Sequence, residues 1–247
     1  MTAGDILVVW QSTAALTGNA LADAVALLSD DERARLERIR FADAARDYAA
    51  AHALLRRVLS RGRATSPRDW RFARTPTGKP FLVDDAAPAM SFSLSHTRGL
   101  VACAVAPAAV AVGVDVEPCD REIDVDRLAA RFFAESEVAA LRARAGGERR
   151  DRFFDLWTLK EAVAKALGLE LPPALAAVAL EIDERPTGPD LRLVRSPTGA
   201  DAAWQLALFT PIAGYRMAVA AVRPTGSPPL PISCSTSEIL STHPHST

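Results

Sequence analysis

The chain has 247 residues, 49% of them apolar, so it can bury a substantial core and its bulk is expected to fold. Lys and Arg total 29 against 30 for Asp and Glu, and this balance argues against a protein built to coat nucleic acid. The cysteines, Cys103, Cys119 and Cys234, are too widely spaced for a disulfide framework or a zinc site, which fits a reducing cytoplasm.

Neither a signal peptide nor a membrane span is predicted. The N-terminal segment MTAGDILVVW lacks a basic region followed by a long apolar one. The longest apolar stretch, residues 99–114, is interrupted by Pro107 and is too short to cross a bilayer. We therefore expect a cytoplasmic protein that binds neither membranes nor nucleic acid.

The first half of the chain is predicted to be a helix followed by strands. A short strand is expected over residues 5–10, and a helical stretch over 28–62 is capped by Ser29 or Asp30 and bends near Phe41. Short antiparallel strands are expected next, over residues 91–95, 100–106 and 110–116.

The same order of elements recurs after Pro118. Helical patterns over residues 124–146 and 148–169 precede strand-like runs at 174–182, 191–196, 202–210 and 215–223. This repetition predicts an α+β fold of two similar lobes, each a helix packed on a small antiparallel sheet, over residues 1–108 and 109–224. Residues 225–247 are rich in Pro, Ser and Thr and are predicted to be a disordered tail.

The stretch AVGVDVEP, residues 111–118, sets two acids into an apolar strand. Alternation places Asp115 and Glu117 on one face, where they either raise one another's pKa or share a cation such as Mg²⁺. The alternative is an ordinary strand whose outer face is solvated.

A second group of polar residues lies on the helix at 148–169. Trp157, Glu161 and Lys165 recur every four residues and so share one face. The alternative is a surface Glu–Lys pair beside a core tryptophan.

A third group surrounds a glycine turn. Arg74, Gly78 and Lys79 could hold phosphates, and His96 ends a strand nearby. The alternatives are a simple turn and a structural histidine.

Together these stretches resemble the 4′-phosphopantetheinyl transferases, in particular the larger two-lobed type that activates surfactin synthetase. GVDVEP is similar to the family motif G-[IV]-D-[IVL]-E, RFFAESE to F-F-x-x-x-E, and LWTLKEAVAKALG to W-[STC]-x-K-E-[AS]-x-x-K. GKP and SLSH are similar to an upstream pair of motifs, and the resemblance extends from about Asp30 to Arg223.

The resemblance implies the pseudo-twofold fold of that family and a Mg²⁺-dependent reaction, with Mn²⁺ as an alternative ion. The 4′-phosphopantetheine moiety of coenzyme A would pass to a serine hydroxyl of an apo acyl or peptidyl carrier protein, releasing adenosine 3′,5′-bisphosphate. We expect a monomer with one complete site at the interface of its lobes. The alternatives are a module that only binds coenzyme A or a carrier protein, and a Mg²⁺-dependent phosphohydrolase, in which GKP and SLSH would have no role.

The resemblance also implies roles for individual residues. The metal ligands would be Asp115, Glu117 and Glu161. The base would be Glu161 or Glu137, with a metal-bound water as an intermediary, and Lys165 or else Lys160 would neutralise or protonate the leaving phosphate. The implied coenzyme A contacts are Arg35, Arg74, Gly78, Lys79, Pro80, Ser95 and His96, with Arg38 and Arg46 as weaker candidates.

Overall fold

The computed structural model describes residues 4–83, 90–197 and 203–237. The helices are α1 (Gly18–Ala26), α2 (Asp30–Leu36), α3 (Ala42–Ser60), α4 (Val125–Phe132), α5 (Glu135–Arg142), α6 (Gly146–Leu167) and α7 (Pro173–Ala177). The strands are β1 (Ile6–Ser12), β2 (Phe72–Arg74), β3 (Pro80–Leu82), β4 (Met90–Thr97), β5 (Leu100–Pro107), β6 (Ala111–Pro118), β7 (Ala179–Asp183), β8 (Asp190–Arg195), β9 (Ala203–Phe209), β10 (Tyr215–Arg223) and β11 (Ile232–Thr236).

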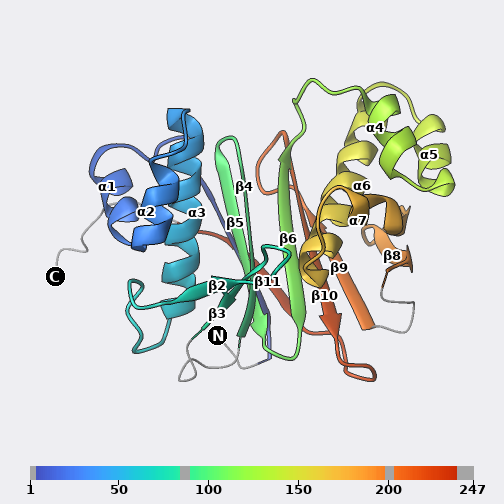
Figure 1. Cartoon of the computed structure of the whole chain (residues 1–247). Coiled ribbons are helices and arrows are strands. Elements are labelled where there is room, and N and C mark those ends of the chain that lie inside the picture. Colours follow the sequence, from blue (N-terminus) through green and yellow to red (C-terminus); the bar gives the residue numbers. More distant parts are fainter. Residues whose placement is uncertain (1–3, 84–89, 198–202, 238–247) are drawn as a thin grey trace.

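Two sheets form the centre of the molecule, and long helices lie outside them (Figure 1). The first sheet has the order β11-β1-β5-β4, and α3 packs on β4 and β5. The second has the order β6-β10-β9, and α6 packs on β6 and β10. The prediction of an α+β fold with a helix on each of two small sheets is therefore confirmed.

Side-chain alternation along the strands builds separate cores on the two faces of each sheet. On β5, Val101 and Cys103 face α3, whereas Ala102 and Ala104 face the second sheet. The core between the sheets also takes in alternate residues of β6 and β10, such as Val114. The outward faces of β6 and β10 are therefore left for α6.

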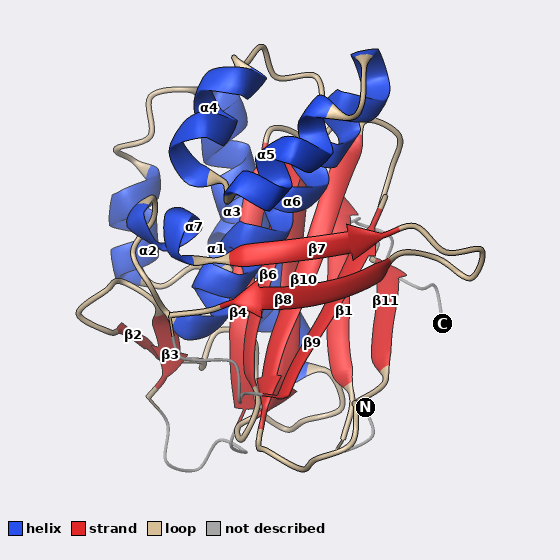
Figure 2. Ribbon diagram, turned by 90° about the vertical axis from the view of Figure 1, so that its right-hand side faces the viewer, coloured by secondary structure: helices blue, strands red, loops and turns tan. Residues whose placement is uncertain are grey.

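Two small hairpins complete the structure. The β2–β3 hairpin stands beside the first sheet, and the β7–β8 hairpin crosses the strands next to α6 (Figure 2). Helix α1 was not predicted from the sequence, and neither was the pairing of strands β2 and β3. In the described part of the chain, no helix combines the length and apolarity needed to cross a membrane.

The structure corrects several expected boundaries. The bend near Phe41 is confirmed, because α2 ends at Leu36 and α3 begins at Ala42. The helix expected over 124–146 is divided into α4 and α5, and the strand expected over 174–182 begins with the short helix α7.

The prediction of a disordered tail over 225–247 is wrong for its first half. Strand β11 pairs in parallel with β1, with Val8 opposite Cys234, so this segment returns to the first sheet. Backbone pairing with an otherwise open sheet edge orders a sequence whose composition favours disorder. Residues 238–247 lie outside the described part.

Candidate active site

Strand β6 carries two acids on the face that meets α6. Val114 and Val116 point into the core between the sheets, so Asp115 and Glu117 point the opposite way. Gly113 shares the face of the acids, and a Cβ added there would lie 2.0 Å from the carbonyl oxygen of Ala162. The missing side chain lets α6 rest directly on β6, which brings Glu161 to the two strand acids.

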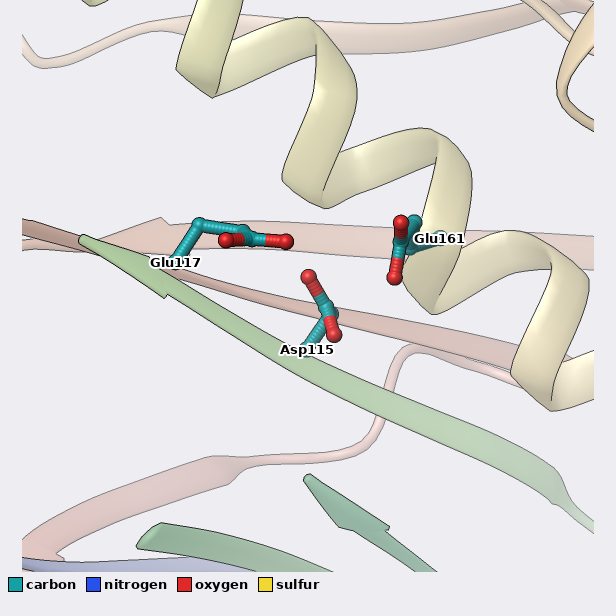
Figure 3. Close-up of side chains that lie close together, drawn as sticks. All are labelled: Asp115, Glu117 and Glu161. Atoms are coloured by element: carbon teal, nitrogen blue, oxygen red, sulfur yellow. The ribbon is translucent and has the colours of Figure 1, made fainter. Parts of the chain in front are cut away.

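The carboxylates of Asp115, Glu117 and Glu161 form one cluster (Figure 3). One oxygen from each residue lies within 4.8 Å of the others. Asp115 is 2% exposed and Glu117 8% exposed, which excludes a solvated outer strand face. Burial, followed by the charge of Asp115, raises the pKa of Glu117, and the same two causes raise the pKa of Glu161 to about 8.

The chemistry of the cluster fits a hard divalent cation. The Oδ2 atom of Asp115 is buried and has no hydrogen-bond partner among the described residues. Buried polar atoms are rarely left in this state, and carboxylate oxygens are the ligands that Mg²⁺ prefers. A cation would satisfy this oxygen and offset the repulsion among the acids.

Lys165 lies beside this cluster. Its ammonium donates to Asp115 Oδ1 at 2.5 Å and to Ser95 Oγ at 2.9 Å, and its side chain is 26% exposed. Lys165 therefore forms its ion pair with a strand acid, whereas Glu161 lies one turn away on the same helix. Arg121 approaches from the other end of the cluster and donates to Glu117 Oε2 at 2.8 Å.

Glu137 and Lys160 do not join the cluster. Their side chains form an ion pair of 2.8 Å in which both are 0% exposed. Glu137 also accepts from the amides of Ala134 and Leu180, and Lys160 donates to the carbonyls of Phe132, Leu175 and Val178. The catalytic roles expected for this pair stay predictions, and the geometry argues against them, because both groups are sealed from solvent and engaged in joining α5 and α6 to the start of β7.

A groove of about 550 Å³ runs between α2, α3 and the β2–β3 hairpin. Arg35, Arg38, Arg71 and Arg74 line it together with Tyr48 and Pro80. A smaller groove lined by Gly78, Lys79 and Lys165 shares Pro80, Phe92 and Leu94 with the first. The two grooves are therefore neighbours, and the smaller one reaches Lys165 beside the carboxylate cluster.

Three of the residues expected to contact coenzyme A lie in or next to the turn of the β2–β3 hairpin. Gly78 adopts φ +86° in the hairpin turn, and Arg74 donates to its carbonyl at 2.9 Å. Lys79 donates to the Ala166 carbonyl at the end of α6 at 2.7 Å, and burial lowers its pKa to about 8. Lys79 therefore ties the hairpin to the helix that carries Glu161.

The remaining candidates lie partly outside the groove. Ser95 is buried beside Asp115, and His96 is exposed, with its ring edge-on to Tyr48 at 6.3 Å. Arg46 pairs with Asp43 and Asp47 and does not line the groove.

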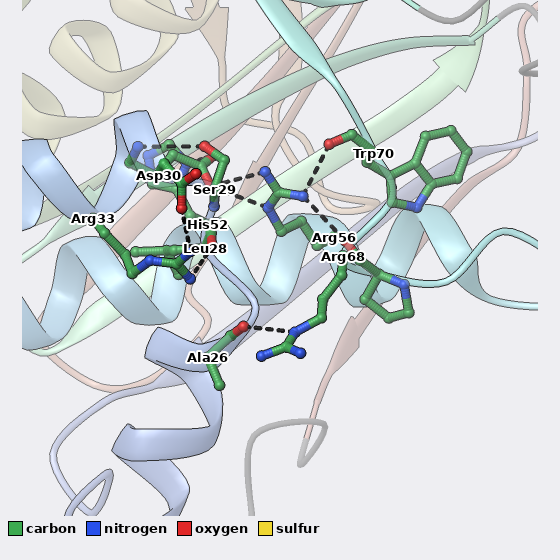
Figure 4. Close-up of polar contacts among 11 residues, drawn as sticks. Ala26, Leu28, Ser29, Asp30, Arg33, His52, Arg56, Arg68 and Trp70 are labelled. Atoms are coloured by element: carbon green, nitrogen blue, oxygen red, sulfur yellow. Dashed lines mark hydrogen bonds and ion pairs between the residues drawn. The ribbon is translucent and has the colours of Figure 1, made fainter.

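Sequence reasoning missed the network that supports the groove (Figure 4). Glu32 accepts from His52 at 2.8 Å and from Arg56 at 2.8 Å, which holds α2 on α3 and so places Arg35. Burial acts to raise the pKa of Glu32, but His52, Ser29 and Arg56 outweigh it and hold the pKa at about 2. The capping box formed by Ser29 and Glu32 was the available signal.

Comparison with known proteins places the chain in a family. The model described as the 4′-phosphopantetheinyl transferase superfamily matches residues 111–220, and that for the N-terminal part of 4′-phosphopantetheinyl transferases matches residues 10–108. The chain belongs to the 4′-phosphopantetheinyl transferase superfamily. The two matches meet between β5 and β6, where the chain leaves the first sheet for the second.

Curated relatives carry the same description. The chain is 36% identical to the 4′-phosphopantetheinyl transferase HetI of Nostoc sp. over 60% of its length and 62% of HetI. It is 34% identical to a putative 4′-phosphopantetheinyl transferase of Synechocystis sp. over 58% of each protein. It is 28% identical to the 4′-phosphopantetheinyl transferase Sfp of Bacillus subtilis over 81% of the chain and 84% of Sfp. The alignment thus spans about six tenths of the length of the first two relatives.

Proposed function

We propose that this chain transfers the 4′-phosphopantetheine moiety of coenzyme A to a serine hydroxyl of an apo carrier protein, as a holo-acyl-carrier-protein synthase does. The carrying observation is the cluster of Asp115, Glu117 and Glu161 beside Lys165, in which one buried oxygen has no partner in the part of the chain that the structure describes. Membership in the superfamily and the names of the relatives support the same reaction.

In the proposed reaction the serine oxygen forms a bond to the phosphorus of the phosphopantetheine group. The bond from that phosphorus to adenosine 3′,5′-bisphosphate breaks, and the serine proton leaves to a base. Phosphoryl transfer needs little covalent help, so positioning and charge neutralisation supply most of the catalysis.

The residues divide these tasks among themselves. Asp115, Glu117 and Glu161 would hold Mg²⁺, or Mn²⁺ in its place. The ion, when bound, neutralises phosphate charge and orients the phosphate oxygens. Glu161 is our candidate for the base, because Glu137 is committed to Lys160. Lys165 holds its ammonium where charge develops on the leaving phosphate.

The two halves of the chain would divide the substrate. Residues 1–108 supply Arg35 and Arg74, whose guanidinium groups would bind the nucleotide phosphates in the groove that Pro80 also lines. Lys79 in the adjoining groove and His96 are further candidates for coenzyme A contacts. Residues 109–224 supply the metal ligands and Lys165. One chain then holds a complete site, so we propose a monomer.

Product analysis with the full chain tests the proposal. The protein is incubated with Mg²⁺, coenzyme A and separate apo acyl and peptidyl carrier proteins, and the carriers are weighed by intact-mass spectrometry. We expect a mass increase of one phosphopantetheine on a serine, with an equal amount of adenosine 3′,5′-bisphosphate. Cleavage of coenzyme A without a modified carrier would instead identify a phosphohydrolase, and binding without turnover would identify a binding module.

A further inference from the structure

The edge strands β4 and β6 are joined through serine side chains. Ser91 donates to the carbonyl of Val110, Ser93 accepts from the amide of Val114 at 3.0 Å, and Ser95 accepts from the amide of Val116 at 3.3 Å. We call this row of contacts the serine seam. Ser93 and Ser95 bond backbone amides of β6, and Ser91 bonds the residue just before it, so the row fastens the first sheet to the second.

Ser95 differs from the other residues of the seam because it also contacts the carboxylate cluster. Its hydroxyl donates to Asp115 Oδ1 at 2.9 Å and accepts from Lys165 at 2.9 Å. A hydroxyl offers one donor and two acceptor lone pairs, and with the Val116 amide all three are in use. The Ser95 side chain is thereby fixed in one orientation.

These contacts determine which oxygen of Asp115 remains available. Oδ1 is engaged by Ser95 and Lys165, whereas Oδ2 has no partner among the described residues. Ser95 is itself only 5% exposed, so its hydroxyl is enclosed by these protein groups. Through Ser95, the serine seam therefore engages one oxygen of the carboxylate cluster and leaves the other oxygen of Asp115 available.

We propose that Ser95 is a positioning residue that orients the Asp115 carboxylate and the Lys165 ammonium. Without the hydroxyl, the carboxylate can rotate and the ammonium can approach both of its oxygens, so the lysine competes with the cation for Oδ2. The catalytic part of this inference rests on the proposed transfer reaction, whereas the effect on the cation does not.

Alanine substitution at two positions of the seam separates positioning from simple attachment of the sheets. Ser95→Ala removes all three contacts, and Ser93→Ala, in an equally buried position, removes only the bond to a β6 amide. Both full-length variants are titrated with Mn²⁺ in the absence of coenzyme A and carrier, and then assayed for kcat and for KM of coenzyme A. Thermal unfolding of both confirms that they are folded.

Ser95→Ala should weaken Mn²⁺ binding and lower kcat by roughly 10- to 100-fold each, the usual effect of losing a residue that orients a metal ligand. Ser93→Ala should lose similar thermal stability but keep kcat and Mn²⁺ affinity close to those of the wild type. Ser95→Thr, which retains the hydroxyl, should recover more activity than Ser95→Ala. If Ser95→Ala does not fold, Ser95→Cys preserves the volume with a weaker donor and takes its place.

Two results would overturn the assignment. A rise in KM for coenzyme A with unchanged kcat and Mn²⁺ affinity would make Ser95 a substrate contact. Equal effects of the Ser93 and Ser95 variants would reduce Ser95 to a link between the sheets. A wild-type protein that modifies no carrier would refute the proposed function, while the Mn²⁺ titration would still decide whether Ser95 positions Asp115.

Discussion

Helix α6 contributes a lysine to each of two lysine–carboxylate pairs that have opposite character. Lys160 and Glu137 are 0% exposed, and their polar atoms are engaged by each other and by backbone groups. Lys165 and Asp115 lie next to two further acids, and Oδ2 of Asp115 has no partner within residues 4–83, 90–197 and 203–237. Removing one partner of the satisfied pair would leave a buried charge uncompensated, whereas the unsatisfied oxygen, beside two further acids, favours a ligand site.

The first prediction concerns the unsatisfied pair and has the largest expected effect. Asp115→Ala and Glu161→Gln should each abolish transfer, because each removes a carboxylate oxygen from the cluster. Thermal stability without metal should not fall in Glu161→Gln, since the substitution relieves repulsion between buried acids. Carrier modification and thermal unfolding measure the two effects. A Glu161→Gln enzyme that is nearly as active as the wild type at saturating Mg²⁺ would contradict the metal assignment.

The second prediction breaks the satisfied pair. Lys160→Met leaves the Glu137 charge buried without a counterion, which should lower the free energy of unfolding by roughly 3–5 kcal/mol. The kcat per folded molecule should stay near that of the wild type, because neither residue contacts the cluster. Urea unfolding and active-site-normalised kinetics test this. A large loss of kcat in a folded, stable Lys160→Met protein would restore Lys160 as a catalytic candidate.

The matched change, Lys165→Met, should mainly lower kcat, whereas Lys160→Met should mainly lower stability. A positioned charge that acts in the transition state is worth about 2.7–4 kcal/mol, so kcat should fall ~100- to 1,000-fold with a smaller change in KM for coenzyme A. Stability should fall less than in Lys160→Met, because the lysine lies partly in solvent and Asp115 keeps its hydrogen bond from Ser95. Lys165→Arg should retain partial activity if charge and not proton donation matters. Steady-state kinetics that place Lys165→Met within a few-fold of the wild type would remove this lysine from the mechanism.

The fourth prediction compares two partly buried acids, Glu32 and Glu161, whose neighbours shift their pKa values in opposite directions. Cationic partners hold the pKa of Glu32 at about 2, below its unfolded value of 4.5, whereas Glu161 is raised to about 8. The ion-pair contribution of Glu32 is therefore fully present above about pH 4.5 and is lost as the pH falls toward 2. It amounts to at most about 3 kcal/mol at neutral pH.

Glu32→Gln should lower the free energy of unfolding at pH 7, and its difference from the wild type should shrink below pH 4.5. Glu37→Gln, an exposed change at the end of α2, is the control and should have little effect at either pH. Urea unfolding across this pH range measures the difference. A constant difference between pH 7 and pH 3 would show that Glu32 stabilises the fold through packing and not through its charge.

Local periodicity determined much of the candidate site in advance. The alternation of a strand placed Asp115 and Glu117 on one face, and the four-residue spacing of a helix placed Glu161 and Lys165 together. Residues spaced in this way lie on the same face of their strand or helix in any fold that forms those elements. The α+β class could therefore be predicted from the order of the elements, whereas the meeting of Glu161 with the two strand acids was implied by the family resemblance and not by spacing.

Tertiary contacts decided what periodicity leaves open. Lys160 and Lys165 have the same chemistry on the same helix, and only their neighbours, backbone carbonyls for one and Asp115 for the other, separate their roles. Ser95 became part of the cluster because β4 lies beside β6. Residues 232–236 became a strand because β1 had a free edge. Each outcome depends on groups distant in sequence, whose desolvation and hydrogen bonding arise only when the sheets and helices pack together.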